Sequence, residues 1–489
     1  MLTRLKVTGF KNLVDADVSF GPFTCIAGVN GVGKSNLFDA IAFLGSLADK
    51  PFFEAASGVR AEGGRTDIRS LFHRAGTTMA SEMSFEAEML IPESGTDELN
   101  QDAKAEATFL RYRLVLGWDT DGLSLRSEEL EAIDPRRADD FLLFPHTPEW
   151  RQSVVLGSPL HGRLISTGIQ NGEPFVNLRQ LLGHPLRHHA DRLTGTVLST
   201  ATAALNPTVA LARREMQGWR LLQLEPSALR APDSFSSPRR IAANGAHLPA
   251  TLARIAGIPS SFGRAASHQL SAVERESLYA RIANRLAELF EGVRSVRVDV
   301  DERRELIRLL LDDRDGTEHE ARALSDGILR FLALAILESD PEAVGVLCVE
   351  EPENGIHPER ISSMLRLLRD LAVDPTEPCG ADNPLRQVIV STHSPIVASQ
   401  VPDDSLLLAA PESRRQEGQS FSAPVFRSLS ETWRARAFPE VSAVSLGSVL
   451  SYLNPVEPSP DRAGAPDAQR VIDREDIQAW MPSPTTEKP

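Results

Sequence analysis

The sequence predicts an α/β fold in which a mixed β-sheet is flanked by helices, and two observations favour this class. The first is a glycine-rich run that follows a short apolar stretch, residues 23–27, and precedes an amphipathic segment, residues 36–47. The second is a pair of apolar runs later in the chain, residues 344–349 and 388–390, each followed by polar residues. Buried strands that alternate with helices and end in polar side chains are typical of a sheet with a site at one edge.

The glycine-rich run, Gly28 to Ser35, fits the phosphate-binding template G-x-x-x-x-G-K-[ST]. Its glycines let the backbone point successive N–H groups at phosphate oxygens. Lys34 supplies a cation for the β- and γ-phosphates, and Ser35 offers a hydroxyl to Mg²⁺. A chance match is expected only about 0.02 times in a chain of this length. The motif therefore predicts a P-loop nucleotide-binding fold.

Composition limits the other possibilities. At 489 residues the chain exceeds one ordinary core, so we expect two structural units or one domain with a large insertion. The net charge of −15 argues against a broad nucleic-acid-binding surface but is compatible with a local basic groove. The cysteines, Cys25, Cys348 and Cys379, are not spaced for zinc or a disulfide framework. No apolar stretch approaches the roughly 18 residues that cross a membrane, and residues 1–10 lack a secretion signal, so we expect a cytoplasmic protein without a membrane partner.

Hydrophobic periodicity predicts the remaining elements. In chain order, we expect strands at residues 2–7, 15–20, 83–91 and 108–118, helical tracts within 197–216, a strand at 219–224, a helix at 274–290, a hairpin over 295–311 and a helix at 328–337. This divides the chain into an N-terminal lobe over 1–130, an inserted α+β region over 131–270, a C-terminal lobe over 271–450 and a disordered tail over 451–489.

Three short motifs in the second half carry chemistry. Ser325 and Gly327 lie at a predicted helix N-terminus, which favours an anion but also suits an ordinary helix cap. Glu350 and Glu351 follow a buried strand, where one carboxylate suits metal coordination and the other water activation, although an acidic surface loop is the simpler alternative. His393 follows the next strand and is placed to contact a γ-phosphate, but a single histidine there is more often structural.

In this order, the four motifs resemble the ATP-binding-cassette (ABC) head shared by SMC, RecF and OLD-type proteins. They are more similar to the compact AAA-type ATPases of bacterial defence and toxin-linked operons. Residues 1–50 and 290–400 carry the likeness, with a weaker match around 244–249. The resemblance implies an ABC-type head with ATP and Mg²⁺ as cofactors.

The same resemblance assigns a role to each matching residue. It makes Gly28 to Asn36 the Walker A loop, with Gly28, Asn30, Gly31, Gly33, Lys34, Ser35 and Asn36 binding ATP. Lys11 and Asn12 match a phosphate contact from the first hairpin. Ser325 and Gly327, with Arg330 on the same helix, form the signature that meets the γ-phosphate of the opposite subunit. Glu350 and Ser35 hold Mg²⁺, Glu351 is the general base, His393 is the switch histidine, and residues 354–358 occupy the D-loop position.

Two departures from the family pattern stand out. Family heads generally carry Asp where this chain has Glu350, and the additional methylene group would move the carboxylate relative to Mg²⁺. Relatives also place a glutamine after the first lobe to join the metal shell, but this sequence has no glutamine before Gln101. Either Gln101 or a different residue serves there, or the ligand is missing.

The resemblance implies an ATP-dependent, head-to-tail homodimer that hydrolyses ATP. Our leading hypothesis is that it gates a partner effector, such as a nuclease or toxin, in phage defence. The chain after His393 is too short for the nuclease domain that OLD-type relatives append.

Two alternatives remain open. One is a RecF- or SMC-like DNA-repair or DNA-maintenance ATPase that binds nucleic acid, with candidate basic contacts at Arg187 among His184, His188 and His189, and at the pairs Arg213-Arg214 and Arg239-Arg240. The other is a nucleotide-binding switch with negligible hydrolysis.

Overall fold

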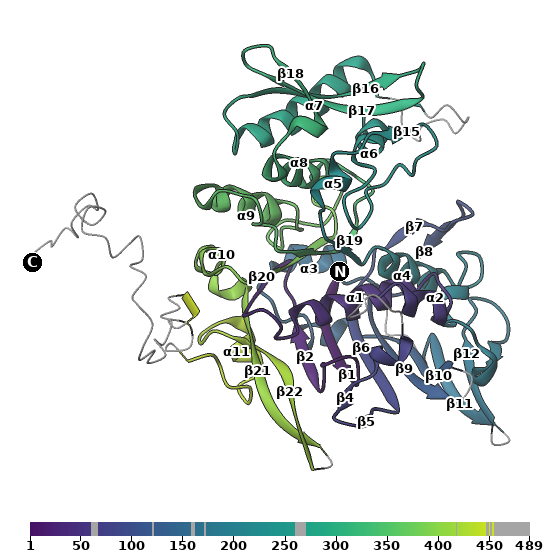
Figure 1. The fold of residues 1–489 in the computed structure, drawn as a ribbon. Coiled ribbons are helices and arrows are strands. Elements are labelled where there is room, and N and C mark those ends of the chain that lie inside the picture. Colours follow the sequence, from purple (N-terminus) through teal and green to yellow (C-terminus); the bar gives the residue numbers. More distant parts are fainter. Residues whose placement is uncertain are drawn as a thin grey trace, which may run out of the picture.

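The computed structural model describes residues 1–59, 67–119, 122–157, 162–170, 173–259, 270–416, 418–445, 449 and 452–453. Within these residues, two large sheets lie on either side of the N-terminal helix, and a smaller sheet and further helices lie above them (Figure 1). The predicted tail beyond residue 453 lies outside the described residues.

The central sheet has six strands and is mixed, as the sequence predicts. Strands β14, β19, β20, β3 and β21 run parallel to one another, and β22 pairs antiparallel with β21. In spatial order the strands are β14 (Arg220–Leu222), β19 (Gly345–Glu350), β20 (Arg386–Thr392), β3 (Phe23–Ala27), β21 (Leu406–Gln416) and β22 (Gln419–Ser428).

Helices cover both faces of this sheet. Because side chains alternate along a strand, Ile26 joins one hydrophobic core while Cys25 and Ala27 join the other. The first core holds α1 (Lys34–Leu47), which the sequence predicts from residue 36. The second core holds α7 (Ala272–Ala287), α8 (Asp326–Glu338), α9 (Ile361–Asp370) and α10 (Pro395–Gln400).

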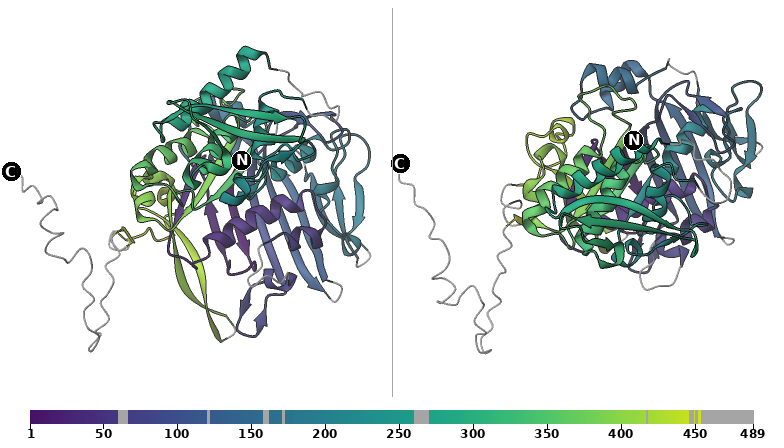
Figure 2. Two further views of the ribbon diagram at one scale, coloured as in Figure 1. Left: turned by 45° about the horizontal axis from the view of Figure 1, so that its top comes forward. Right: turned by 90° about the horizontal axis from the view of Figure 1, so that it is seen from above.

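The second large sheet is an eight-stranded antiparallel sheet. In spatial order it contains β13 (Leu186–His189), β12 (Glu173–Leu178), β11 (Ile165–Gln170), β10 (Gly122–Ala132), β9 (Phe109–Asp119), β6 (Glu82–Leu90), β1 (Leu2–Thr8) and β2 (Ala16–Ser19). Helix α1 lies across its face (Figure 2). The rings of Phe10, Phe43 and Phe85 pack with centroids 5.6 to 5.9 Å apart and join the helix to the sheet.

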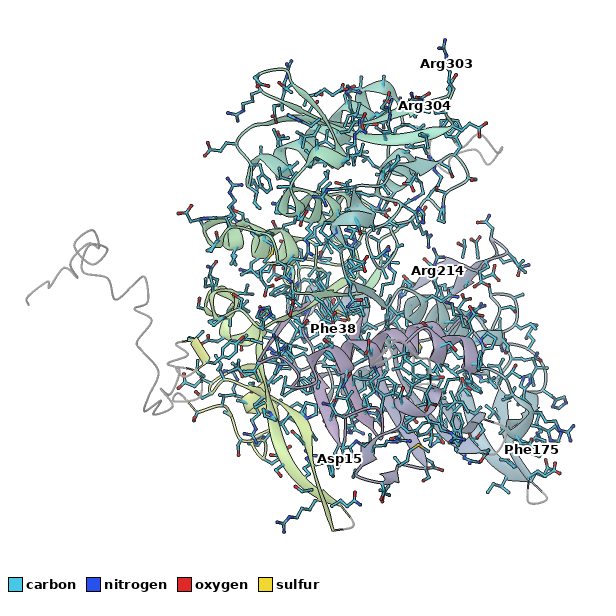
Figure 3. All side chains as sticks on the ribbon, viewed as in Figure 1. Asp15, Phe38, Phe175, Arg214, Arg303 and Arg304 are labelled. Carbon is cyan, nitrogen blue, oxygen red and sulfur yellow. The ribbon has the colours of Figure 1, made fainter. Side chains whose placement is uncertain are left out.

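A third sheet lies at the top of the view in Figure 1. Strands β16 (Val293–Asp301) and β17 (Leu306–Asp313) form the predicted hairpin, with β15 (Asp233–Ser234) and β18 (Glu318–Glu320) also paired to β17. Arg303 and Arg304 lie at its tip, whereas Phe38 of α1 lies in the interior (Figure 3). In the view of Figure 1, α8 lies between this sheet and β19.

Shorter elements complete the fold. The helices are α2 (Phe52–Ser57), α3 (Pro148–Val154), α4 (Pro207–Gln217), α5 (Pro226–Leu229), α6 (Leu248–Ile255) and α11 (Trp433–Ala437), and the strands are β4 (Arg74–Ala75), β5 (Thr78–Met79), β7 (Ser94–Thr96) and β8 (Asp102–Lys104). Short 3-10 helices at 68–71, 135–140, 190–192, 198–200, 321–323, 358–360 and 403–405 link them.

Residues 131–270, predicted as an inserted region, contribute strands to the sheets on both sides of α1. Strands β11 to β13 extend the antiparallel sheet, and β14 forms one edge of the central sheet. Helix α4 covers only residues 207–217 of the predicted helical tract. The long β21–β22 hairpin was not predicted from the sequence. In the described part of the chain, no helix has the length and apolar character needed to span a bilayer.

Candidate functional site

The motifs predicted from separate parts of the chain meet at one edge of the central sheet. Strands β3, β19 and β20 are parallel, so their carboxyl ends lie side by side. In the register of these strands, Glu350 lies opposite Ser391, and Thr392 lies opposite Ala27. The phosphate loop, the glutamate pair and His393 all follow these ends, which is where open α/β sheets bind ligands.

The phosphate loop has the backbone that anion binding requires. Gly33, at φ +116°, precedes the first turn of α1, and Gly31 has φ +78°. Such left-handed conformations strain residues with a Cβ atom. Helix α1 has no side-chain cap and no acidic residue in its first turn, so its positive end faces the loop.

Lys34 is folded against its own loop. Its Nζ donates hydrogen bonds to the Gly28 carbonyl at 2.6 Å and the Val29 carbonyl at 2.9 Å, and its side chain is buried. Burial lowers the pKa of Lys34, while Glu351 and Glu350 act in the opposite direction. The cation is thus held beside the position that the template gives to phosphate.

A cavity of about 530 Å³ opens over the phosphate loop, a volume within the range of small-molecule sites. Its lining combines residues from the loop, the segment between β14 and α5, α8, β19 with the loop after it, and β20. They are Asn30, Gly31, Gly33, Lys34, Ser35, Asn36, Gln223, Leu224, Glu225, Pro226, Arg330, Glu350, Glu351, Asn354 and Ser391. Most of the predicted ATP-binding residues therefore surround one cavity.

Glu350 has a partner that the sequence analysis did not identify. Gln223 follows β14, and its Nε2 donates to Glu350 Oε2 at 2.5 Å. Gln101, the earlier candidate, is exposed beside β8 and does not line this cavity. The strand predicted at residues 219–224 could have identified Gln223 as this partner. A glutamine at the carboxyl end of a parallel strand reaches the same edge of the sheet as Glu350. Together, Ser35, Glu350 and Gln223 offer the oxygen donors that Mg²⁺ prefers.

Glu351 is held in an uncommon backbone conformation, with φ +44°. Its carboxylate accepts from Asn354 Nδ2 at 2.8 Å and contacts His393 Nδ1 at 2.8 Å. Burial alone would raise the pKa of Glu351, but the hydrogen bonds from Asn354 and His393 outweigh it and hold the pKa below its ordinary value. The carboxylate is therefore ionised at neutral pH. Left-handed backbone at a residue that carries a Cβ is a frequent mark of functional sites.

Glu353, two residues further on, was not singled out from the sequence. It is buried and accepts a hydrogen bond from the Thr392 hydroxyl. Burial raises its pKa, although the bond from Thr392 opposes this. The contact joins the loop after β19 to the end of β20, just before His393.

The predicted signature lies at the start of α8. Ser325 caps this helix by accepting from Ile328 N at 3.4 Å and is exposed. A Cβ atom added to Gly327 would lie 2.5 Å from the Gly355 carbonyl oxygen, so only glycine lets α8 pack on the loop after Glu351. Neither residue lines the cavity. Arg330, expected with them in the opposite subunit's site, instead lines the cavity of its own chain.

Lys11 and Asn12 lie behind the phosphate loop rather than in the cavity lining. Lys11 Nζ pairs with Asp39 Oδ2 of α1 at 2.6 Å. Asn12 donates to the Val32 carbonyl at 3.3 Å and accepts from Asn36 Nδ2 at 2.8 Å. In this structure both residues support the loop and α1.

The basic clusters considered for nucleic acid have partners within the chain. Arg213 pairs with Glu98 at 2.8 Å, and Arg240 pairs with Glu342 at 2.7 Å. Arg187 donates to Asn177 at 3.2 Å. The described residues contain no group of three or more His, Cys, Asp or Glu side chains that could hold a metal, so the histidines around Arg187 form no such site.

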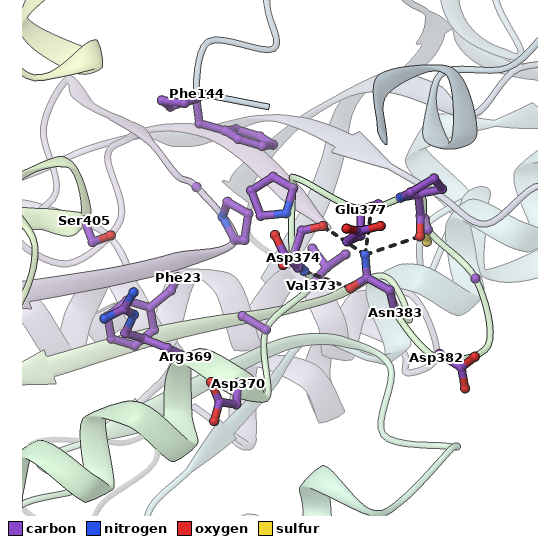
Figure 4. Close-up of a pocket in the computed structure, with 18 of the residues that line it drawn as sticks. Phe23, Phe144, Arg369, Asp370, Val373, Asp374, Glu377, Asp382, Asn383 and Ser405 are labelled. Carbon is purple, nitrogen blue, oxygen red and sulfur yellow. Dashed lines mark hydrogen bonds between the residues drawn. The ribbon is translucent and has the colours of Figure 1, made fainter. Parts of the chain in front are cut away.

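A larger cavity, about 960 Å³, lies at the opposite edge of the central sheet, where β3 begins at Phe23. Figure 4 shows its lining, which includes Phe144, Asp370 and the loop over residues 373–383. Asn383 Nδ2 donates to the Asp374 and Glu377 carbonyls, each at 2.9 Å, and closes this loop on itself. None of the predicted site residues lines this cavity.

Comparison with known families identifies the relatives of this site. A profile described as "AAA domain, putative AbiEii toxin, Type IV TA system" matches residues 23–147 and 194–399, more than half of the chain. The chain belongs to this AAA domain family. The resemblance to AAA-type ATPases of toxin-linked operons is thereby confirmed. No curated protein matches the chain.

Several solved structures are remotely similar to this AAA protein. An SMC head bound to the C-winged helix domain of ScpA has 18% identity and a TM-score of 0.47, over 88% of this chain and 98% of that one. An SMC head from Pyrococcus furiosus, bound to the C-terminal domain of ScpA, has 13% identity and a TM-score of 0.45, over 90% and 98% of the two chains. The SMC head domain from Thermotoga maritima has 13% identity and a TM-score of 0.35, over 87% and 98%.

Proposed function

We propose that this AAA protein binds and hydrolyses ATP at the cavity over its phosphate loop. The observation that carries the proposal is that Lys34, at the start of α1 after β3, and Glu350 and Glu351, at the end of β19, line one cavity. The loop over residues 28–36 holds the phosphates through its backbone N–H groups, and Lys34 turns from its own carbonyls to the β- and γ-phosphates.

The oxygen donors beside the loop would hold Mg²⁺. Ser35, Glu350 and Gln223 supply a hydroxyl, a carboxylate and an amide at the same edge of the sheet. When bound, the ion neutralises charge on the phosphate oxygens. Glu350 replaces the aspartate of family heads, and its longer side chain is held by Gln223.

Glu351 is the general base in this proposal. Its lowered pKa keeps it ionised, and the hydrogen bonds from Asn354 and His393 orient it. It takes a proton from the water that attacks the γ-phosphate in line with the leaving oxygen, and ADP and phosphate leave. His393 positions this base through its contact with Glu351 and, as the switch histidine, would reach the γ-phosphate.

Two copies of the chain would close head-to-tail around two ATP molecules. Ser325 is exposed at the start of α8, and Gly327 packs on the loop of residues 354–358, so the signature and D-loop form one surface. That surface would cover the phosphate loop of the opposite subunit. Loss of the γ-phosphate would remove the contacts that hold the dimer closed.

The closed dimer would control a separate effector protein. The family description names a toxin of a toxin–antitoxin system, which supports a toxin as the effector. A nuclease effector and a role in phage defence are proposed from the resemblance to ATPases of bacterial defence operons. ATP binding and hydrolysis would then set the time for which the effector is held.

The Glu351→Gln variant tests this function. It should bind Mg-ATP and accumulate as a dimer on size-exclusion chromatography, with phosphate release reduced to background, whereas Lys34→Ala should remain monomeric. A monomer in both variants would contradict the dimer. Phosphate release by the wild type equal to that of Glu351→Gln would instead support a nucleotide-binding switch with negligible hydrolysis.

Recovery of tagged Glu351→Gln from its native host with Mg-ATP tests the partner. A stoichiometric protein that is lost with Lys34→Ala would identify the effector. Salt-sensitive nucleic acid without such a protein would favour the DNA-maintenance alternative.

A further inference from the structure

Arg330 occupies a position that its predicted role does not explain. It is the fifth residue of α8 and lines the same 530 Å³ cavity as Lys34, Ser35 and Glu350. Its side chain is half-buried, and its Nε atom is buried without a hydrogen-bond partner. Among the described residues, its guanidinium forms no ion pair within 4.0 Å. Burying a cation in this way is costly unless a counter-charge is supplied.

The carboxylates around Arg330 have other partners. Asp326 pairs with Arg230. Glu351 accepts from Asn354 and contacts His393, and Glu353 accepts from Thr392. These carboxylates favour the charged form of Arg330, but burial outweighs them and lowers its pKa. The counter-charge for this guanidinium is therefore expected from a ligand in the cavity.

We propose that Arg330 binds the polyphosphate of the nucleotide held by the phosphate loop of its own chain. The expectation from the signature was a contact with the nucleotide of the opposite subunit. A guanidinium presents a planar fork of N–H donors that matches phosphate oxygens, and its charge stays on in a desolvated site. This inference rests on the proposed ATPase function and adds a cis contact to it.

The geometry of α8 separates the two roles. Ser325 and Arg330 are five residues apart, which corresponds to about 140° around an α-helix. Ser325 is exposed on the outer surface, while Arg330 lines the cavity. The first turn of α8 thereby faces the opposite subunit, and its second turn contacts the nucleotide of its own chain. A nucleotide bound in cis therefore positions the signature for the partner.

Binding to the monomer tests the contact. Arg330→Ala should weaken the binding of a fluorescent ATP analogue by about 10- to 100-fold, the size expected when a charge-assisted hydrogen bond is lost. Arg330→Lys should recover part of the affinity because it keeps the charge. The control is Arg322→Ala, an exposed arginine just before α8 that pairs with Glu320 at 2.8 Å, and it should bind like the wild type. Wild-type affinity in folded Arg330→Ala would overturn the proposal.

Mixed dimers decide between cis and trans. In a mixed dimer, the Glu351→Gln subunit has an inactive site of its own but a normal Arg330. The Arg330→Ala subunit has a normal Glu351, so its site is intact only if Arg330 reaches it from the opposite subunit. We expect no recovery of phosphate release in this mixture. A mixture of Glu351→Gln with Ser325→Arg should recover activity, because Ser325 acts in trans in the proposed dimer.

The outcomes distinguish the two proposals. Recovery with both partners would overturn the cis assignment and leave the head-to-tail dimer standing. If the mixture with Ser325→Arg recovers no phosphate release, the head-to-tail dimer is contradicted. The ATP affinities of the monomeric variants would then decide whether Arg330 binds the nucleotide of its own chain.

Discussion

The two large sheets on either side of α1 use charged residues in opposite ways. In the antiparallel sheet, Arg111 and Arg113 of β9 pair across the strands with Glu86, Glu88 and Glu131. In the central sheet, Glu350 ends β19 and Glu351 follows it, and Glu351 contacts His393, which follows the end of β20. The charged residues of the antiparallel sheet pair with one another, whereas those of the central sheet lie together at the carboxyl ends of its parallel strands.

Strand direction explains this difference. Antiparallel neighbours place opposite side chains directly across from each other along their whole length, so charges pair in place. Parallel neighbours end together, so residues after β3, β19 and β20 meet at one edge although they are far apart in sequence. Only the second arrangement can bring a lysine and a glutamate pair around one cavity, with a histidine in contact with one of the glutamates.

The largest effect should come from the charge at the parallel edge. Lys34→Ala should weaken ATP binding by roughly 100-fold or more, because it removes the cation that faces the phosphates. In thermal unfolding with ATP at about 100 times its Kd, the wild type should gain about 2.7 kcal/mol of stability and the variant almost none. Equal affinity for ATP in the two proteins would place the ligand site elsewhere and break the comparison.

The second effect concerns the Glu351–His393 pair. Because the pKa of Glu351 lies below its ordinary value, the wild-type rate of hydrolysis should not fall through Glu351 protonation until the pH drops below that value. His393→Ala removes a hydrogen bond that lowers this pKa, so the acid limb of kcat should move to higher pH, with kcat about 10- to 100-fold lower at neutral pH. A lower kcat with an unchanged pH profile would mean that His393 acts without Glu351.

A smaller effect is expected at Gln223. Gln223→Ala should raise the Mg²⁺ concentration needed for half-maximal hydrolysis by about tenfold, because it removes the amide that holds Glu350 at 2.5 Å. Gln101→Ala is the matched control, and magnesium titration should not distinguish it from the wild type. An effect of Gln101 rather than Gln223 would restore the first assignment of the missing glutamine.

The smallest effect should come from the antiparallel sheet. Arg113→Gln removes contacts with Glu86 and Glu131 at the sheet surface, and such exposed networks contribute roughly 0 to 1 kcal/mol. Urea denaturation should show a change of that size, and ATP affinity should stay the same. A loss of ATP binding in this variant would show that the two sheets are not independent in function.

The site motifs and most of the strands around them could be predicted from the sequence. The template from Gly28 to Ser35 and the glutamates after residue 349 could be recognised in the sequence. Each lies within one short segment whose chemistry depends on local spacing. The hairpin of β16 and β17 and the strands β6 and β9 were readable for the same reason, since alternation along a strand is a local pattern.

Tertiary structure alone decided the partners of these motifs. Gln223 and Glu350 are 127 residues apart, and only the parallel pairing of β14 with β19 brings them together. Arg330 lines the cavity of its own chain because of the way α8 packs above the sheet. The spacing of residues within the helix does not predict this packing. Long-range strand order and helix packing depend on many weak contacts across the whole core, so a motif can specify its chemistry without specifying its neighbours.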